Sequence, residues 1–389
     1  MNLAMQHKCY GCMICAEICP VKAIKIKEDE EGFRYPEIDE EICIKCGACE
    51  KICIANKSKI ENKENTTTAV VYAAQNKNNK IRKEETSGGV FSEIASLVIS
   101  KGGTVYGAVL NEQLIVEHQR ADKQEELKKF YGSKYVQSRV ENIYKLIVED
   151  LKQNRLVLFS GTPCQVFALK EYITKKSVNK DNLITCDFVC HGVPSTKIFN
   201  ENIKFLENKY NKKIISYKFR TKDYGWKGHN EKAIFEDGTT TSEYGNKYMN
   251  IYKELYGSLN IIRPSCFECQ FSKKERYSDI TMGDFWGIEK HDKKFADNTG
   301  TSLVIINTEK GKEIFEQIKE AFIFKEEILD ICENPQLRAP TRYPKNREKF
   351  WQEYFKKGYK YIAKKYTTYG LIKKARVKTY NMLKKIKNG

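Results

Sequence analysis

Residues 9–20 read CYGCMICAEICP, and residues 43–53 read CIKCGACEKIC. In both stretches four cysteines follow the spacing C-x2-C-x2-C-x3-C, so one pattern occurs twice within the first 53 residues. Two copies of this spacing are typical of the bacterial ferredoxin arrangement, in which the fourth cysteine of each run binds the cluster held by the other run. The repeat therefore predicts a domain at residues 1–57 that holds two 4Fe–4S clusters.

The same rule assigns the eight ligands to two clusters. The first cluster is expected on Cys9, Cys12, Cys15 and Cys53, and the second on Cys43, Cys46, Cys49 and Cys19. A pair of zinc sites is the alternative, but it could be built from C-x2-C pairs and would leave the third and fourth cysteine of each run without a role. Disulfides are disfavoured, because no apolar signal stretch opens the chain and thiols in a reducing compartment stay available to metal.

The length and composition predict a soluble protein of two or three domains. The chain has 389 residues, of which 41% are hydrophobic. No stretch approaches the roughly 18 apolar residues that are needed to span a bilayer. We therefore expect a cytoplasmic protein, and the oxygen sensitivity of its clusters suits an anaerobic cell.

The net charge of +17 is concentrated at one end of the chain. From Thr341 to Gly389 there are 16 Lys and Arg residues against 2 Glu, which leaves about +3 for the other 340 residues. The body is thus close to neutral, and the tail lacks a recognisable motif for reading nucleic acid. We expect no nucleic-acid partner.

Residues 336–389 are predicted to form a basic helical tail. Its first half interleaves lysines with aromatic side chains, namely Phe350, Trp351, Tyr354, Phe355, Tyr359 and Tyr361. Such a helix either packs on the body or lies on anionic lipid, where each basic residue contributes about 1 kcal/mol. The pattern leaves peripheral contact with the inner membrane surface open.

A glycine pair marks a candidate ligand site in the body. Ser87-Gly88-Gly89 precedes the apolar run Val90, Phe91 and Ile94, so Ser87 is a plausible N-cap of a helix. The first amides of such a helix favour an anion, such as the pyrophosphate of a dinucleotide. A simple capped helix after a turn is the alternative. The chain has neither a G-x-G-x-x-G that opens a βαβ unit nor a P-loop.

Two further segments are candidates for the same site. Lys134 and Tyr135 lie beside small residues, where they would either hold a phosphate and stack on a ring or form an ordinary loop. Residues 155–159 are expected to form a buried strand that runs into Thr162, Pro163 and Cys164. Thr162 would cap the next helix, and Cys164 would lie in its first turn, where the helix dipole stabilises a thiolate. Residues 301–307 are expected to form the final strand.

Six cysteines remain outside the two runs. Cys186 and Cys332 lie in apolar stretches and are expected in the core. The other four, which lie in turns or near the ends of elements, are Cys164, Cys190, Cys266 and Cys269. A C-x2-C pair with two distant cysteines suits a third cubane or a zinc site.

Five motifs of the body together resemble one family. They are SGGVFS at 87–92, GTPCQ at 161–165, CHGVPS at 190–195, CFEC at 266–269 and GDFWG at 283–287. This set, in this order, resembles the beta subunit of the deazaflavin-coenzyme hydrogenase and dehydrogenase family from about Thr68 to Leu329. A two-cluster ferredoxin domain fused to this body resembles the single-chain members, including bacterial ones encoded with surface-polysaccharide enzymes.

The resemblance implies a flavoprotein that carries FAD. The residues that it implies for the flavin are Ser87, Gly88, Gly89, Val90, Phe91, Lys134, Tyr135 and Thr162. It also implies that Cys164, Cys190, Cys266 and Cys269 hold a third 4Fe–4S cluster. A proton donor is needed beside the substrate, and the candidates are His191, His229 and Asp284, each of which is alternatively a structural hydrogen-bonding residue.

The expected fold is α+β: an N-terminal bacterial-type ferredoxin domain (1–57), an α/β flavin-binding body with a mixed sheet (68–150 and 151–335), and the basic helical tail (336–389). The leading interpretation is an iron–sulfur FAD oxidoreductase that acts on a small organic substrate or a deazaflavin. Its electron donor would be a ferredoxin or a reduced deazaflavin. The alternatives are an electron-transfer subunit without its own small substrate, and a protein that binds nucleic acid or membrane through the tail.

Overall fold

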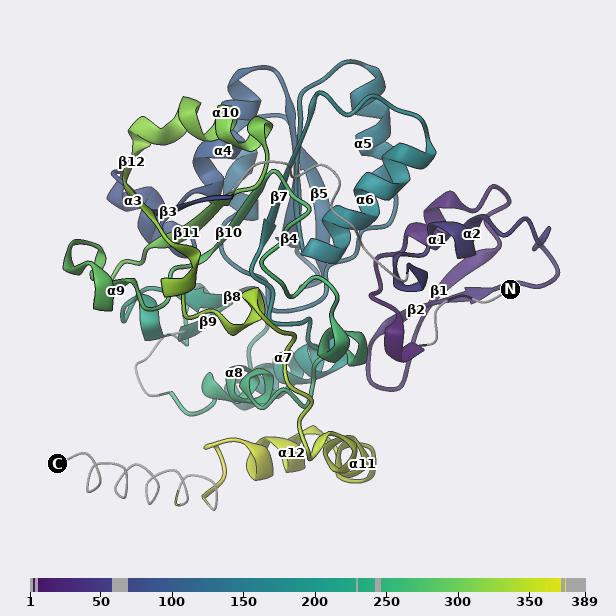
Figure 1. The fold of residues 1–389 in the computed structure, drawn as a ribbon. Coiled ribbons are helices and arrows are strands. Elements are labelled where there is room, and N and C mark those ends of the chain that lie inside the picture. Colours follow the sequence, from purple (N-terminus) through teal and green to yellow (C-terminus); the bar gives the residue numbers. More distant parts are fainter. Residues whose placement is uncertain are drawn as a thin grey trace.

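The computed structural model describes residue 3, residues 6–57, 69–228, 230–241 and 246–371, and residue 375 (Figure 1). Most of the linker expected at 56–68 and the last residues of the tail lie outside this part of the chain. Among the described residues no helix is long and apolar enough to cross a membrane.

The body is built on an eight-stranded mixed sheet. In spatial order its strands are β12 (Phe322–Glu327), β3 (Val70–Asn76), β11 (Ser302–Ile306), β10 (Ile280–Asp284), β7 (Leu183–Phe188), β6 (Val157–Gly161), β4 (Thr104–Leu110) and β5 (Val116–Ala121). The four strands β10, β7, β6 and β4 are parallel, and the strands outside them pair antiparallel. The expected mixed sheet is confirmed. The expectation that 301–307 is the last strand is wrong, because β12 follows and adds to the edge beside β3.

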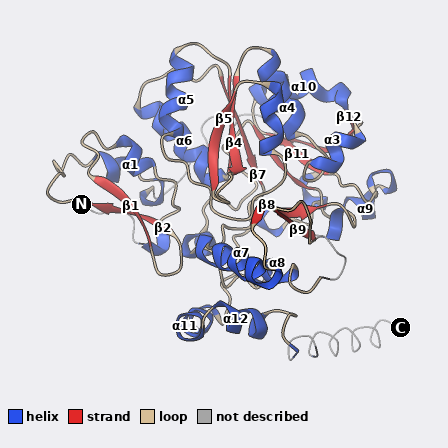
Figure 2. Cartoon of the chain, turned by 180° about the vertical axis from the view of Figure 1, so that it is seen from behind, coloured by secondary structure: helices blue, strands red, loops and turns tan. Residues whose placement is uncertain are grey.

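Helices cover both faces of this sheet (Figure 2). One face carries α4 (Phe91–Ser100) and α10 (Glu309–Ile318), and the other carries α5 (Ile143–Lys152) and α6 (Pro163–Lys175). The first three residues of β6 are all apolar because helices cover both faces of the strand. Val157 and Phe159 pack with α5 and α6, while Leu158 packs with α4 and α10. Short helices α3 (Asn79–Glu84) and α9 (Ile288–His291) complete the body.

A second layer lies below the sheet in the view of Figure 1. It consists of α7 (Thr196–Tyr210), the antiparallel pair β8 (Ile214–Thr221) and β9 (Asn230–Phe235), α8 (Asn250–Gly257), α11 (Arg347–Lys357) and α12 (Tyr359–Tyr366). These elements share one hydrophobic cluster.

The first half of the predicted tail belongs to this layer. Phe350, Trp351, Tyr354 and Tyr359 are buried against α7 and α8. Trp351 Nε1 donates to Asn260 O at 3.0 Å. These four aromatic side chains are therefore core residues, and the idea that they would insert into lipid is wrong. The basic residues from 376 onward lie outside the described residues.

The N-terminal domain repeats its own backbone. Its elements are α1 (Ile14–Ile18), β1 (Ile24–Glu28), β2 (Arg34–Ile38) and α2 (Ala48–Ile52). Each short helix follows a residue with positive φ, Met13 at 61° and Gly47 at 71°, and is followed by the fourth cysteine of its run. The duplicated sequence thus gives a duplicated turn, as expected for a ferredoxin-type domain.

This domain packs tightly on the body (Figure 1). Ile14, Ile18, Ile52 and Ile54 share a hydrophobic cluster with α5 and α6. The fully buried guanidinium of Arg263 joins the two parts, because its Nε donates to Cys9 O at 2.6 Å and its Nη2 to Arg34 O at 3.0 Å. The position of the first cysteine run relative to the body is therefore fixed.

Candidate functional site

The candidate site lies where three parallel strands end. Cys164 follows β6, Cys190 follows β7, and Asp284 is the last residue of β10. Neighbouring parallel strands have their carboxyl ends at the same edge of a sheet, which is where α/β proteins place ligands. The pair Cys266 and Cys269 reaches this edge from the 3-10 helix Pro264–Glu268 and the residue after it.

A cavity of about 460 Å³ opens at this edge. The predicted site residues that line it are Ser87, Val90, Phe91, Lys134, Tyr135, Thr162, Cys164, Cys190, His191, Cys266, Cys269 and Asp284. Gly88 and Gly89 are not among its lining residues, and His229 lies outside the described residues. The structure therefore brings the four body cysteines together with most of the predicted flavin and proton-transfer residues.

The four body thiols lie within electrostatic range of one another. Burial, together with the smaller effect of the Cys269 thiol, raises the pKa of Cys164 and of Cys266 to about 12. Burial also raises the pKa of Cys190, and Cys266 and Cys269 add to that effect. Four half-buried thiols that raise one another's pKa are costly to ionise together, so a group that binds them as thiolates is needed to stabilise the charge.

Two buried guanidinium groups flank these thiols. Arg263 lowers the pKa of Cys164 and Cys266, and Arg276 lowers that of Cys190 and Cys269, although burial is the larger effect in each case. The Gly192 amide also donates to Cys190 Sγ at 3.4 Å. Positive charge and an N–H···S bond around four thiols fit an anionic iron–sulfur cluster.

The N-terminal cysteines lie close enough together for the two predicted ligand sets. Burial raises the pKa of Cys15, and the thiols of Cys9 and Cys53 raise it further, so the fourth cysteine of the second run lies beside the first run. A small second cavity is lined by Cys19, Cys43, Cys46 and Cys49. The amide of Ala23 donates to Cys19 Sγ at 3.2 Å. Both sets fit cubanes, and the ligand assignment stays a prediction.

The three cysteine sets follow one another in space. Cys49 of the second set contributes to the raised pKa of Cys15 in the first set. Cys164 of the body contributes to the raised pKa of Cys12. Within the part of the chain that the structure describes, no three His, Cys, Asp or Glu side chains converge on a single-ion site.

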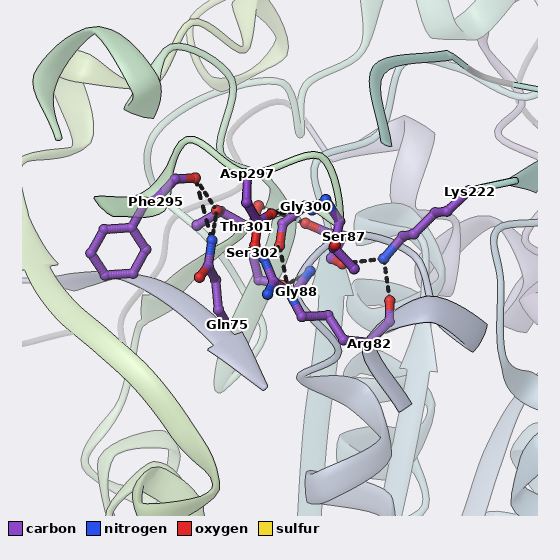
Figure 3. Close-up of polar contacts among 11 residues, drawn as sticks. Gln75, Arg82, Ser87, Gly88, Lys222, Phe295, Asp297, Gly300, Thr301 and Ser302 are labelled. Atoms are coloured by element: carbon purple, nitrogen blue, oxygen red, sulfur yellow. Dashed lines mark hydrogen bonds and ion pairs between the residues drawn. The ribbon is translucent and has the colours of Figure 1, made fainter. Parts of the chain in front are cut away.

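The glycine loop differs from the expectation. Ser87 has φ 58° and is not the N-cap, because α4 begins at Phe91 and its N-cap residue is Val90. Ser87 Oγ instead donates to Thr301 O at 2.7 Å, and the Gly88 amide donates to Ser302 Oγ at 2.8 Å (Figure 3). A Cβ atom on Gly88 would lie 2.1 Å from Ala74 O. The glycine is thus required by packing against β3 and β11, not by the approach of a phosphate.

Two cations that the sequence reasoning missed hold this loop (Figure 3). Lys222 Nζ donates to Ser87 O at 2.5 Å and also to Arg82 O. Arg82 in turn donates through Nη2 to Gly300 O at 2.8 Å and pairs with Asp297. No local sequence signal identifies either residue, because their partners lie more than 130 residues away in the chain.

Lys134 has a structural role beside the cavity. Its Nζ donates to the carbonyl groups of Phe130 at 2.8 Å, Tyr131 at 3.0 Å and Lys129 at 3.2 Å, at the end of the 3-10 helix Gln124–Phe130. Burial lowers the pKa of Lys134 to about 7. Tyr135 stacks on Tyr256 with ring centroids 5.2 Å apart. The ammonium group is therefore largely occupied by backbone carbonyls.

The proton-transfer candidates differ in their partners. Asp284 accepts from Arg220 Nη1 at 2.6 Å and from Trp226 Nε1 at 2.9 Å, so both of its carboxyl oxygens have partners. Burial lowers the pKa of His191, so its imidazole is neutral near pH 7. Thr162 caps α6 as expected, in a capping box with Gln165.

Comparisons with known proteins identify two domains. Residues 154–330 match the C terminus of the coenzyme F420 hydrogenase/dehydrogenase beta subunit, and residues 8–57 match the 4Fe–4S dicluster domain. The family resemblance drawn from the five motifs is thereby confirmed, and so is the N-terminal ferredoxin-type domain.

Individual relatives span different shares of the chain. A subunit of the F(420)H(2) dehydrogenase of Methanosarcina mazei is 27% identical over 345 residues, which are 85% of this chain and 86% of that protein. The methylamine utilization ferredoxin-type protein MauM of Methylobacillus flagellatus is 34% identical over 61 residues, 14% of this chain and 26% of that protein. A chain of the F420-reducing NiFe hydrogenase complex from Methanosarcina barkeri has a TM-score of 0.44 at 16% identity and covers 71% of this chain and 87% of that one.

Proposed function

We propose that this chain, which joins a 4Fe–4S dicluster domain to a C-terminal domain of the kind found in coenzyme F420 hydrogenase/dehydrogenase beta subunits, is an iron–sulfur flavoprotein oxidoreductase. It would exchange electrons between its clusters and FAD, and pass them to or from an organic substrate or a deazaflavin. The name of the Methanosarcina mazei relative supports the deazaflavin as one such substrate.

One observation carries this proposal: four cysteines suited to a cluster and six of the eight residues expected around a flavin line the same cavity. Its volume of about 460 Å³ falls within the usual range of about 300–1,000 Å³ for ligand sites. Phe91, Tyr135 and Trp286 give it aromatic walls that suit a planar ring. Cubanes move single electrons and a flavin converts them to hydride chemistry, so the two groups belong side by side.

The order of the cysteine sets supports a route for electrons. The body set adjoins the cavity, and the set around Cys12 and Cys15 comes next. Farthest from the cavity is the set of Cys19, Cys43, Cys46 and Cys49. Arg263 and the packing of α1 on α6 would hold the middle set at a fixed distance from the body.

The polar residues of the cavity take separate roles in this proposal. His191 lines the cavity and is the proposed proton-transfer group. Asp284 is held by Arg220 and Trp226, so we assign it the positioning of the Arg220 guanidinium at the cavity wall.

A second candidate function is an electron-transfer subunit without a small substrate. The observation that favours it is that the Methanosarcina mazei relative is itself named as one subunit of a dehydrogenase. Turnover of a reduced deazaflavin by the purified chain alone supports the oxidoreductase. Flavin reduction that stalls until another protein is added supports the electron-transfer role.

The test compares two cysteines four positions apart. Cys190 lines the cavity, whereas Cys186 is a buried core residue of β7. In anaerobically reconstituted protein, Cys190→Ala should lose about four irons per chain, keep its FAD, and show flavin reduction by viologen slowed at least about ten-fold. Cys186→Ala should retain iron, FAD and rate. Intact anaerobic protein that releases no flavin on heating, or a Cys190→Ala variant with full iron, contradicts the proposal.

A further inference from the structure

The two cysteine sets of the ferredoxin-type domain have unequal surroundings. The body covers the first set: Cys9 O accepts from Arg263 Nε at 2.6 Å and from Ser265 Oγ at 2.9 Å, and Cys12 O accepts from Tyr144 at 3.0 Å. Cys12 and Cys15 are both buried. The first set therefore faces the body.

The second set faces solvent. Cys46 is exposed, and two large apolar side chains flank Cys43 in the sequence, Ile42 with 46% and Ile44 with 61% of its surface exposed. Ile44 also lines the small cavity together with Cys19, Cys43, Cys46 and Cys49. The exposed side chain of Ile44 thus lies beside the thiols that would hold the outer cluster, and that of Ile42 adds further exposed apolar surface next to Cys43 in the sequence.

Acidic residues border this apolar surface. Glu40 and Glu41 are exposed, and neither forms an ion pair with another described residue. Their neighbours Asp39 and Glu37 are paired with Lys25 and Lys27. The surface at residues 40–46, here called the docking patch, therefore has an apolar centre, the unpaired negative charges of Glu40 and Glu41 on one side, and one exposed cation, Lys45.

We propose that the docking patch binds a soluble one-electron carrier protein whose own redox centre lies beneath a basic surface. Contact at the apolar centre would bring the redox centre of the carrier close to the outer cluster, as electron transfer requires. Weak redox complexes bury small interfaces of this kind. Glu40 and Glu41 complement basic residues on the carrier and would act chiefly on the association rate. The inference rests on the proposed function, because it needs the outer cluster to be present.

The step at this surface is a single electron transfer. The reduced carrier loses one electron and the outer cluster gains one, or the reverse, and no bond forms or breaks. The electron then passes to the inner cluster and on to the cavity.

Stopped-flow oxidation of the dithionite-reduced, reconstituted full chain tests the patch. Cytochrome c serves as a basic protein carrier, and methyl viologen as a small carrier that needs no docking. The variants are Glu40→Lys/Glu41→Lys and Ile42→Ser/Ile44→Ser. The matched control is Ile215→Ser, in which a similarly exposed isoleucine (54%) of β8 is replaced on the other layer.

The charge-reversed variant should react with cytochrome c about ten-fold more slowly at low salt, with the difference shrinking at high salt. The apolar variant should be slowed several-fold at both salt concentrations. The charge-reversed variant should keep the wild-type viologen rate, and Ile215→Ser should match the wild type with both carriers.

Equal cytochrome c rates in all variants overturn the docking patch, as does a slowing that Ile215→Ser shares. A dimer in gel filtration that Ile42→Ser/Ile44→Ser abolishes also overturns it, because the patch would then bind a second copy of the chain. A protein that takes up no electrons from dithionite and carries no iron refutes the proposed function itself. If the docking patch is wrong but the proposed function is right, the reconstituted chain still reacts with methyl viologen.

Discussion

Replacing Arg263 by methionine should loosen the contact between the ferredoxin-type domain and the body. Arg263 is fully buried and donates two bonds that cross this contact, to Cys9 O at 2.6 Å and to Arg34 O at 3.0 Å, and a third within the body, to Gln137 Oε1 at 2.8 Å. Its guanidinium also lies 4.3 Å from the centre of the Tyr35 ring. Methionine fills much of the volume but donates nothing.

The magnitude follows from the acceptors that are left. Cys9 O keeps its bond from Ser265 Oγ, so two buried acceptors, Arg34 O and Gln137 Oε1, lose their arginine donor. A buried unsatisfied polar group costs about 1–3 kcal/mol, and the lost cation–π contact adds about 1 kcal/mol. We expect the free energy that opens the domain contact to fall by about 3–7 kcal/mol. Arg263→Lys, which keeps the charge and reaches fewer acceptors, should lose about half as much.

Native-state hydrogen exchange of amides in residues 9–19 measures this opening. A loss of about 3 kcal/mol accelerates exchange by about two orders of magnitude, because every 1.4 kcal/mol is a factor of ten. The control is Arg338→Met, since Arg338 also donates to backbone carbonyls, of Cys332 and Asp330, but is exposed and far from the contact. Exchange in residues 9–19 that is unchanged in Arg263→Met, or equally fast in Arg338→Met, refutes the reasoning.

Three other expectations concern the body. Gly88→Ala should lower the melting temperature strongly even in flavin-free protein, because its Cβ would lie 2.1 Å from Ala74 O; Gly257→Ala, which meets nothing within 4 Å, should not. Phe350→Ala should lower the free energy of unfolding by about 3–5 kcal/mol, whereas Phe355→Ala, at a side chain that is 49% exposed, should lower it by less than about 1 kcal/mol. Equal losses would contradict the burial of Phe350 in the protein. Burial raises the pKa of Glu231 to about 8, so the folded state binds this proton more tightly than the unfolded one. Its stabilising contribution is therefore complete below about pH 4.5 and is lost as the pH rises to about 8, and urea titrations of Glu231→Gln should show a flatter pH profile over that window than the wild type.

Local sequence was sufficient to predict the ferredoxin-type domain. The eight cysteines lie in two runs of eleven residues, and ligand spacing within one turn is a local property that the chain direction and a few positive-φ residues fix. The assignment of Cys19 and Cys53 to opposite sets also came from the repeat and stays a prediction, with which the neighbours of both cysteines agree. The capping of α6 by Thr162 was predictable for the same reason, since its partner Gln165 is three residues away.

Other parts of the site needed long-range packing. Parallel pairing of β6 and β7 brings Cys164 and Cys190 to one edge of the sheet, and Arg263 fixes the loop that precedes Cys266. Spacing alone could not say whether these cysteines form a cubane, a zinc site or a reactive thiol. The role of Gly88 was misread, because the atom that excludes a side chain there belongs to Ala74 on another strand.

The tail shows the same limit. Its aromatic residues and lysines alternate in a way that suits lipid and protein equally, and only the presence of α7 and α8 decides that Phe350, Trp351, Tyr354 and Tyr359 are buried in protein. Local spacing thus identified which residues can bind metal in the first 53 positions. Long-range packing settled which distant cysteines share a cavity and which apolar faces are already covered, because these depend on contacts between segments that the sequence does not place side by side.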